Sequence, residues 1–105
     1  MHSLLTQYED ISAFSGASAE CRHHLIFGSG VRQLADEDGL WIPLTNSEHN
    51  MSPEGLIMQI HGNPTAEKLS KICGQLAWEK QVIMDGYTDE EARNAFMRRY
   101  GISYL

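Results

Sequence analysis

A helix of about twenty residues in the second half of this 105-residue chain is the feature that most restricts its fold. Asn63 is a suitable N-cap, and Pro64 is favourable at the first helical position. Apolar residues then recur at steps of three and four positions, and Gly86 ends the pattern. The pattern predicts an amphipathic helix from about residue 64 to 84, with these apolar residues facing inward: Leu69, Ile72, Leu76 and Ile83.

A second, shorter helix is predicted directly afterwards. Thr88 and Glu91 have the spacing of a capping box, and Gly101 is suited to end a helix. The two helices make residues 64–105 the helical part of the chain.

The first half contains fewer regular elements. Residues 1–20 are predicted to be irregular, and short strands are predicted at 21–27 and 40–44. Pro43 cannot donate to a strand ladder, so the second strand should lie at an edge or end there. We therefore expect residues 1–105 to form one small α+β domain, with a short β-hairpin, long loops and two C-terminal helices.

Composition excludes several classes of protein. Apolar residues make up 42% and charged residues 21%, as in globular domains, and no apolar run is long enough for a transmembrane segment. The net charge of −6 argues against attachment to nucleic acid by bulk electrostatics, although a local site remains compatible with it. With no basic and apolar leader at the N-terminus, and two cysteines that make no disulfide framework, we expect a cytoplasmic protein without membrane contact. Cys73 falls within the helical pattern and is predicted to be buried.

Histidines point to a candidate site. His23, His24, His49 and His61 all lie in the loop-rich half, and the two predicted helices contain none. Histidine binds metals and exchanges protons near neutral pH. At the end of a strand, one member of the adjacent pair could bind a metal while the other accepts a proton from water. Arg22 and Arg32 flank the pair and could hold a phosphate, a use that suits arginine.

The ordered set of these motifs resembles the HNH endonuclease superfamily, and in particular small HNH-like proteins of bacteriophages and prophages. The similar segments are the histidine pair with the four residues that follow it (25–28), Gly39 with the second predicted strand at 40–44, His49 with Asn50, and the ending at 96–105. Arg32 also matches, as do His61 and Gln75, before and within the long helix. The resemblance covers about residues 12–105.

The resemblance implies a ββα-metal core and a metal-dependent DNA endonuclease. It assigns metal binding to His23 and the role of general base to His24. His49 and His61 are candidates for the remaining ligands, and Asn50 could instead orient the general base; which of the three binds the metal stays open. The implied cofactor is one divalent ion, either magnesium, manganese, nickel or zinc.

The chain also departs from the family. Many relatives hold a structural zinc with two cysteine pairs, which would fall here at Ser12 and Ser15 and at Thr45 and Glu48. Because none of the four is cysteine, we expect no four-cysteine zinc site.

Two functions from different classes follow. The first is a phage- or prophage-encoded DNA endonuclease in the host cytoplasm, with a homodimer as a reasonable arrangement for cutting both strands. The alternative is a catalytically inactive HNH-like binding module, or an inhibitor of a host factor, whose partner is a host or phage protein. The missing cysteines and the acidic balance favour the alternative, whereas the histidine set favours the endonuclease.

Overall fold

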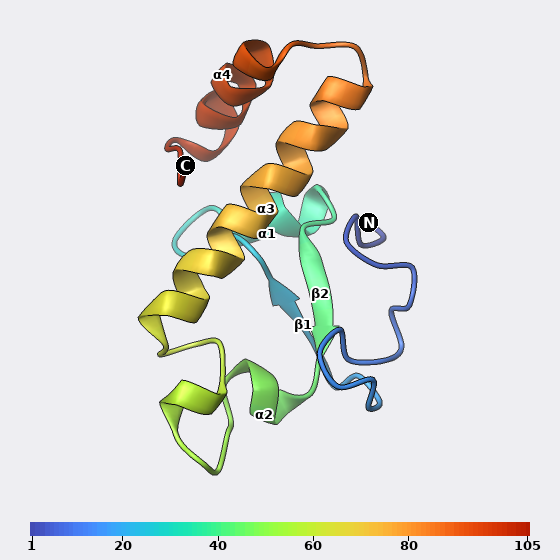
Figure 1. The fold of residues 1–105 in the computed structure, drawn as a ribbon, viewed down its shortest axis with the longest axis vertical. Helices are drawn as coiled ribbons and strands as arrows, with labels where there is room; N and C mark the ends of the chain where they lie inside the picture. The colour runs from blue at the N-terminus through green and yellow to red at the C-terminus, as the bar shows by residue number, and fades with distance from the viewer.

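The computed structural model describes residues 1–105, apart from the side chain of Ile57. It confirms the α+β class, with one two-stranded antiparallel sheet and four α-helices. The elements in chain order are β1 (Cys21–His24), α1 (Arg32–Glu37), β2 (Trp41–Leu44), α2 (Asn46–His49), the 3-10 helix η1 (Leu56–Met58), α3 (Pro64–Met84) and α4 (Asp89–Tyr100) (Figure 1). No helix among the described residues is long and apolar enough to cross a membrane.

The hairpin is shorter than the sequence predicts. β1 ends at His24, which pairs with Trp41, and one further bond joins the Leu25 amide to the Leu40 carbonyl at 2.8 Å. Pro43 is accommodated because each strand of a two-stranded sheet pairs with another strand along one edge only. Neighbouring side chains of a strand point to opposite faces, so His23 faces α3 and His24 faces α1.

The long helix has the predicted ends but not the predicted inward face. Leu69, Leu76 and Ile83 are 55%, 51% and 39% exposed, Cys73 is also exposed, and Ile72 is only half-buried. The prediction that these residues supply the core is therefore wrong, except in part for Ile72. The buried residues of α3 are instead small or polar: Ser70, Gly74, Gln75 and Glu79.

Partners elsewhere in the chain explain this reversed orientation of α3. A Cβ atom at Gly74 would lie 2.8 Å from Ile26 Cγ1, so only glycine allows the helix to approach so closely. Gln75 Oε1 accepts a bond from the Tyr104 amide at 2.7 Å. Glu79 accepts one from Arg93 Nε at 2.8 Å. Polar side chains can face inward here because each has a partner.

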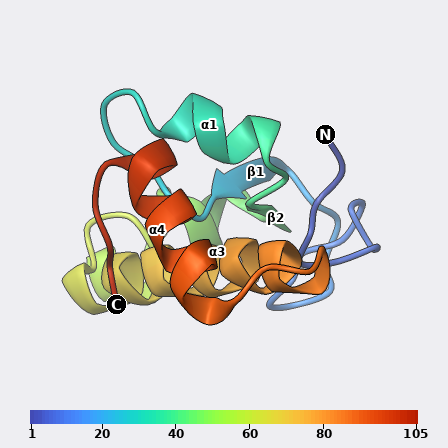
Figure 2. The ribbon, with the colours of Figure 1, turned by 90° about the horizontal axis from the view of Figure 1, so that it is seen from above.

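The hydrophobic core lies where α4 meets the hairpin and α1. Its buried members are Leu25, Ile26, Ala35, Leu40, Phe96 and Tyr100. Seen from above, α4 lies between α1 and α3 (Figure 2). Asp38, just after α1, joins the three helices: its carboxylate accepts bonds from Tyr100, Arg99 and Trp78 at 2.6, 2.6 and 3.0 Å.

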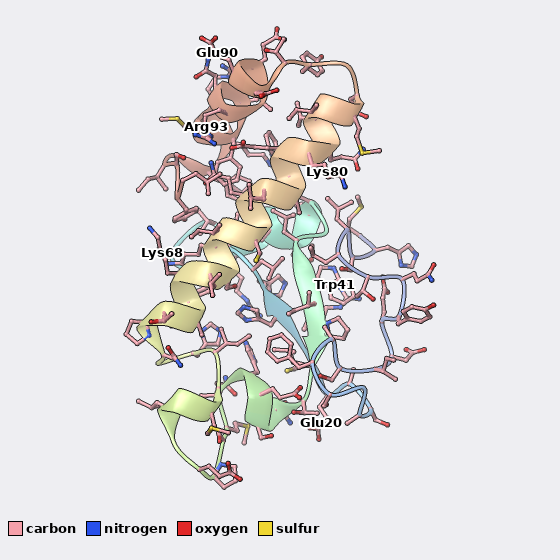
Figure 3. The ribbon with its side chains drawn as sticks, in the orientation of Figure 1. Glu20, Trp41, Lys68, Lys80, Glu90 and Arg93 are labelled. Carbon is pink, nitrogen blue, oxygen red and sulfur yellow. The ribbon has the colours of Figure 1, made fainter. Side chains whose placement is uncertain are left out.

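Residues 1–20 lie beside β2 and form no helix, as predicted (Figure 1). Trp41 projects from β2 towards this segment, and its indole N–H donates to the Met1 carbonyl at 3.1 Å (Figure 3). Ser3 Oγ donates to the Trp41 carbonyl at 2.6 Å, and the Ala13 amide donates to the Pro43 carbonyl at 2.9 Å. These bonds cover the outer edge of the hairpin.

Candidate metal centre

Three of the predicted site histidines come together from three parts of the chain. His23 lies on β1, His49 ends α2, and His61 precedes α3. One nitrogen from each lies within 4.8 Å of the others, which is close enough for the three to share one ion. We call His23, His49 and His61 the histidine triad.

The backbone between α2 and α3 brings His49 beside His61. Thr45 caps α2 through a capping box with Glu48. After η1 the chain turns back towards α2, and the Ile60 amide donates to the Glu48 carbonyl at 2.9 Å. The His61 amide then bonds to the His49 carbonyl at 3.0 Å, and the two ring centroids lie 4.6 Å apart.

His23 is the most buried member of the triad, with none of its surface exposed. Burial first, and then the neighbouring His49, His61 and His24, together lower the pKa of His23 to about 3. The His49 pKa is lowered as well, first by burial and then by His61. The ring of His23 is therefore neutral at pH 7, which is the form that binds a metal.

The residues present fit a bound metal ion. His23 Nε2 lies 2.7 Å from Ser70 Oγ, but Nδ1 of the same ring is buried without a hydrogen-bond partner among the described residues. A buried nitrogen with an unused lone pair is costly unless something binds it. Three imidazole ligands suit zinc or nickel, whereas magnesium prefers oxygen ligands.

The other predicted residues, except Asn50, form a second group on the opposite face of β1. His24 Nε2 lies 2.9 Å from Asp36 Oδ1, and Arg32 Nε donates to His24 Nδ1 at 3.3 Å. The Arg22 guanidinium lies 3.9 Å above the Trp41 ring and 3.8 Å from Asp36. The hydrogen bond with His24 is the largest cause that lowers the pKa of Asp36. A cavity of about 510 Å³ is lined by His24, Arg32 and Asp36 together with Gly30 and Gln33.

Asn50 lies apart from both groups. It is the exposed C-cap of α2, and its backbone amide bonds to the Asn46 carbonyl at 3.0 Å. Although Asn50 directly follows His49 in the chain, the Asn50 side chain makes no hydrogen bond to His24 in the structure.

Sequence reasoning missed the residues that support the histidines. Ser70 bonds to His23, Glu67 Oε2 lies 3.5 Å from His61 Nδ1, and Asp36 bonds to His24. The sequence contained only a weak signal for these three supporting residues. Ser70 and Glu67 are polar residues one turn apart at the start of a helix that follows a candidate ligand, and Asp36 belongs to a charged turn that reads as solvated.

The four positions at which the sequence resemblance would place zinc-binding cysteines are close in space. Ser12 Oγ donates to Glu48 Oε1 at 2.6 Å, and the Thr45 amide donates to the same oxygen at 2.9 Å. Burial alone would raise the pKa of Glu48, but hydrogen bonds from Ser12, Thr45 and Ser15 outweigh it and lower this pKa. Hydrogen bonds to one carboxylate thus connect the N-terminal segment to α2.

Comparison of the chain with family models, curated proteins and solved structures finds no match. The chemistry available to the chain is that of its own two groups: the histidine triad on one face of β1, and His24 with Asp36 and the two arginines on the other.

Proposed function

We propose that this protein is a metal-dependent phosphodiesterase of HNH type that cleaves DNA. One observation carries the proposal: the buried His23 nitrogen without a partner lies in a triad with His49 and His61, on the strand that also carries His24. The resemblance in sequence assigns the same two neighbouring residues to the metal and to the proton acceptor.

In this proposal the histidine triad holds one divalent ion. When bound, such an ion offsets the negative charge that develops on a phosphodiester during hydrolysis. The donor set favours zinc or nickel over magnesium among the four candidate ions.

His24, the next residue along β1, faces away from the triad in this conformation and has to turn towards it to accept the proton of the attacking water. Because an arginine Nε only donates, its bond to His24 Nδ1 means that the lone pair is on Nδ1 and the proton is on Nε2, towards Asp36. Arg32 has to leave Nδ1 before that atom can accept a proton. A phosphate of the substrate is a stronger partner for Arg32 than a neutral imidazole, so substrate binding would release the base.

The alternative function, a catalytically inactive binding module or an inhibitor of a host factor, has its own support. Both ring nitrogens of His24 are hydrogen-bonded in the structure, so neither is available to water in this conformation. The net charge of −6 also suits a protein partner better than a polyanion.

The two functions are separated by a plasmid cleavage assay with magnesium, manganese, nickel or zinc, run beside metal titrations of the same proteins. His24→Ala should cut at least about 10²-fold more slowly while binding metal as the wild type does, since a missing proton acceptor cannot be replaced. His23→Ala should bind metal more weakly, and excess metal should partly restore its cleavage.

The matched control is His2→Ala, which removes a terminal imidazole whose side chain is 95% exposed and should change neither property. A wild-type protein that binds metal but cuts no DNA with any of the four ions would favour the binding module. Equal cleavage by His24→Ala and wild type would show that the base is not His24.

A further inference from the structure

We propose that Ser70 and Glu67, at the start of α3, are positioning residues that determine which ring nitrogen of two histidines faces the metal: Nδ1 of His23 and Nε2 of His61. The inference rests on the metal site of the proposed function, but not on DNA cleavage. It concerns where the protons of the two rings lie, and this can be measured without any metal.

For His23 the proton position follows from a chain of two hydrogen bonds. Ser70 Oγ lies 2.7 Å from the Leu25 carbonyl oxygen and 2.7 Å from His23 Nε2. A carbonyl can only accept, so the single hydroxyl proton of Ser70 goes to Leu25. Ser70 then has only lone pairs to offer His23, and the ring must donate from Nε2.

A neutral imidazole carries one proton, so a proton on Nε2 leaves Nδ1 with a bare lone pair. That atom is buried and has no partner among the described residues. Nδ1 is therefore the nitrogen of His23 that is available to an ion.

For His61 the neighbouring group is a carboxylate. Glu67 Oε2 lies 3.5 Å from His61 Nδ1 and also accepts the Gly62 amide at 3.3 Å. A carboxylate only accepts, so its negative charge favours the proton on Nδ1 and leaves Nε2 for the ion. The contact is longer than that of Ser70 and about one third exposed, so we expect a weaker preference here.

Both positioning residues lie on one helix, three positions apart, and so on the same face of α3. Asn63 begins this helix by accepting bonds from the Thr65 and Ala66 amides, which fixes the helix relative to the preceding His61. One rigid element thus supports two ligands that come from different segments.

The test is the proton position in metal-free protein at pH 7, read from long-range ¹H–¹⁵N correlations of the histidine rings, followed by zinc titration of the same samples. In the wild type, His23 should carry its proton on Nε2, and zinc should then shift the Nδ1 resonance of His23 and the Nε2 resonance of His61. Ser70→Ala should lose the single His23 tautomer and bind zinc about 10–100-fold more weakly.

Two further variants separate positioning from folding. Ser70→Thr keeps the hydroxyl and should restore both the tautomer and most of the affinity, and Glu67→Gln should weaken zinc less than Ser70→Ala does. Ser29→Ala removes an exposed hydroxyl outside the site and should change nothing.

A wild-type His23 protonated on Nδ1 would overturn the inference, as would a folded Ser70→Ala protein with unchanged tautomer and zinc affinity. If Ser70→Ala fails to fold, the wild-type tautomers and the Ser70→Thr titration still decide. A wild type with the expected tautomers that binds neither zinc nor nickel would instead overturn the metal site of the proposed function, while the tautomer assignment would stand.

Discussion

The surroundings of His23 favour its uncharged ring, and this lowers the folding stability of the protein at low pH. In the unfolded chain its pKa is close to 6.5, whereas burial and three neighbouring imidazoles lower the folded value to about 3. Between these two values the unfolded state binds a proton that the folded state excludes. Folding stability in this range must therefore depend on pH.

We expect metal-free protein to lose stability as the pH falls below about 6.5, with a contribution from His23 of at most about 1.4 kcal/mol per pH unit. The sign follows from proton binding: the unfolded state takes up more protons, so the free energy of unfolding rises with pH through this range. His49, whose pKa is also lowered, contributes in the same direction. Urea unfolding at a series of pH values between 7 and 4.5 measures the slope.

The range above pH 4.5 is chosen because the carboxylates with lowered pKa, such as Asp36 and Glu48, lose their contribution only at lower pH. His23→Gln should flatten the slope and His2→Gln should not. An unchanged slope in His23→Gln would show that His23 is charged in the folded protein or exposed to solvent.

At the scale of the secondary elements, the ends of α3 could be predicted from sequence, but its buried face could not. The helix begins where Asn63 and Pro64 indicate, because capping involves only residues next to each other in the chain. The buried face depends on partners far away in sequence: Ile26 against Gly74, and Arg93 against Glu79. Periodicity records which side of a helix is apolar, and here that side is exposed.

Gly74→Ala is expected to destabilise the protein although alanine is the better helix former. The gain in helix propensity is about 1 kcal/mol. Against it, the added methyl would lie 2.8 Å from Ile26 Cγ1 and 3.1 Å from Leu25 Cβ, and overpacking of this kind costs about 1–3 kcal/mol. The net loss, up to about 2 kcal/mol, is measured by chemical denaturation.

The control is to make Gly74→Ala in a protein that already carries Ile26→Ala. Ile26→Ala should itself cost about 2–5 kcal/mol, because Ile26 is fully buried in the core. With that side chain shortened, Gly74→Ala should be neutral or stabilising, so the two substitutions should couple strongly in a double-mutant cycle. Additive effects of the two would mean that the helix and the hairpin are not in contact at Gly74.

At the scale of the whole molecule, sequence identifies the candidate ligands but not the elements that bring them together. His23, His49 and His61 could be selected because imidazoles are unusual in such number and in irregular segments. The three histidines come together because the chain turns back to α2 at Ile60 and His61. Backbone hydrogen bonds fix this turn, and the pattern of side chains in the sequence does not indicate them. Ser70 was missed for the same reason, since its partner His23 is distant in sequence.

The histidine triad is separate from what holds the fold together, and this decides how the protein should respond to metal. None of the triad belongs to the buried core cluster around Ile26 and Phe96. The N-terminal segment is attached to α2 through Ser12 and Glu48, and α4 to the end of α1 through Asp38. None of these connections includes a member of the histidine triad.

We therefore expect a strong chelator to leave the protein folded, with helical circular dichroism and cooperative thermal unfolding retained. Zinc should raise the Tm above this metal-free value, because a ligand that binds only the folded state adds about 2.7 kcal/mol at a free concentration of a hundred times its Kd. His49→Ala should show nearly the same Tm with and without zinc, since it lacks one of three ligands. Unfolding of the wild type by the chelator alone would mean that a metal holds the fold itself, and that the hydrogen-bonded Ser12, Thr45 and Glu48 do not replace it.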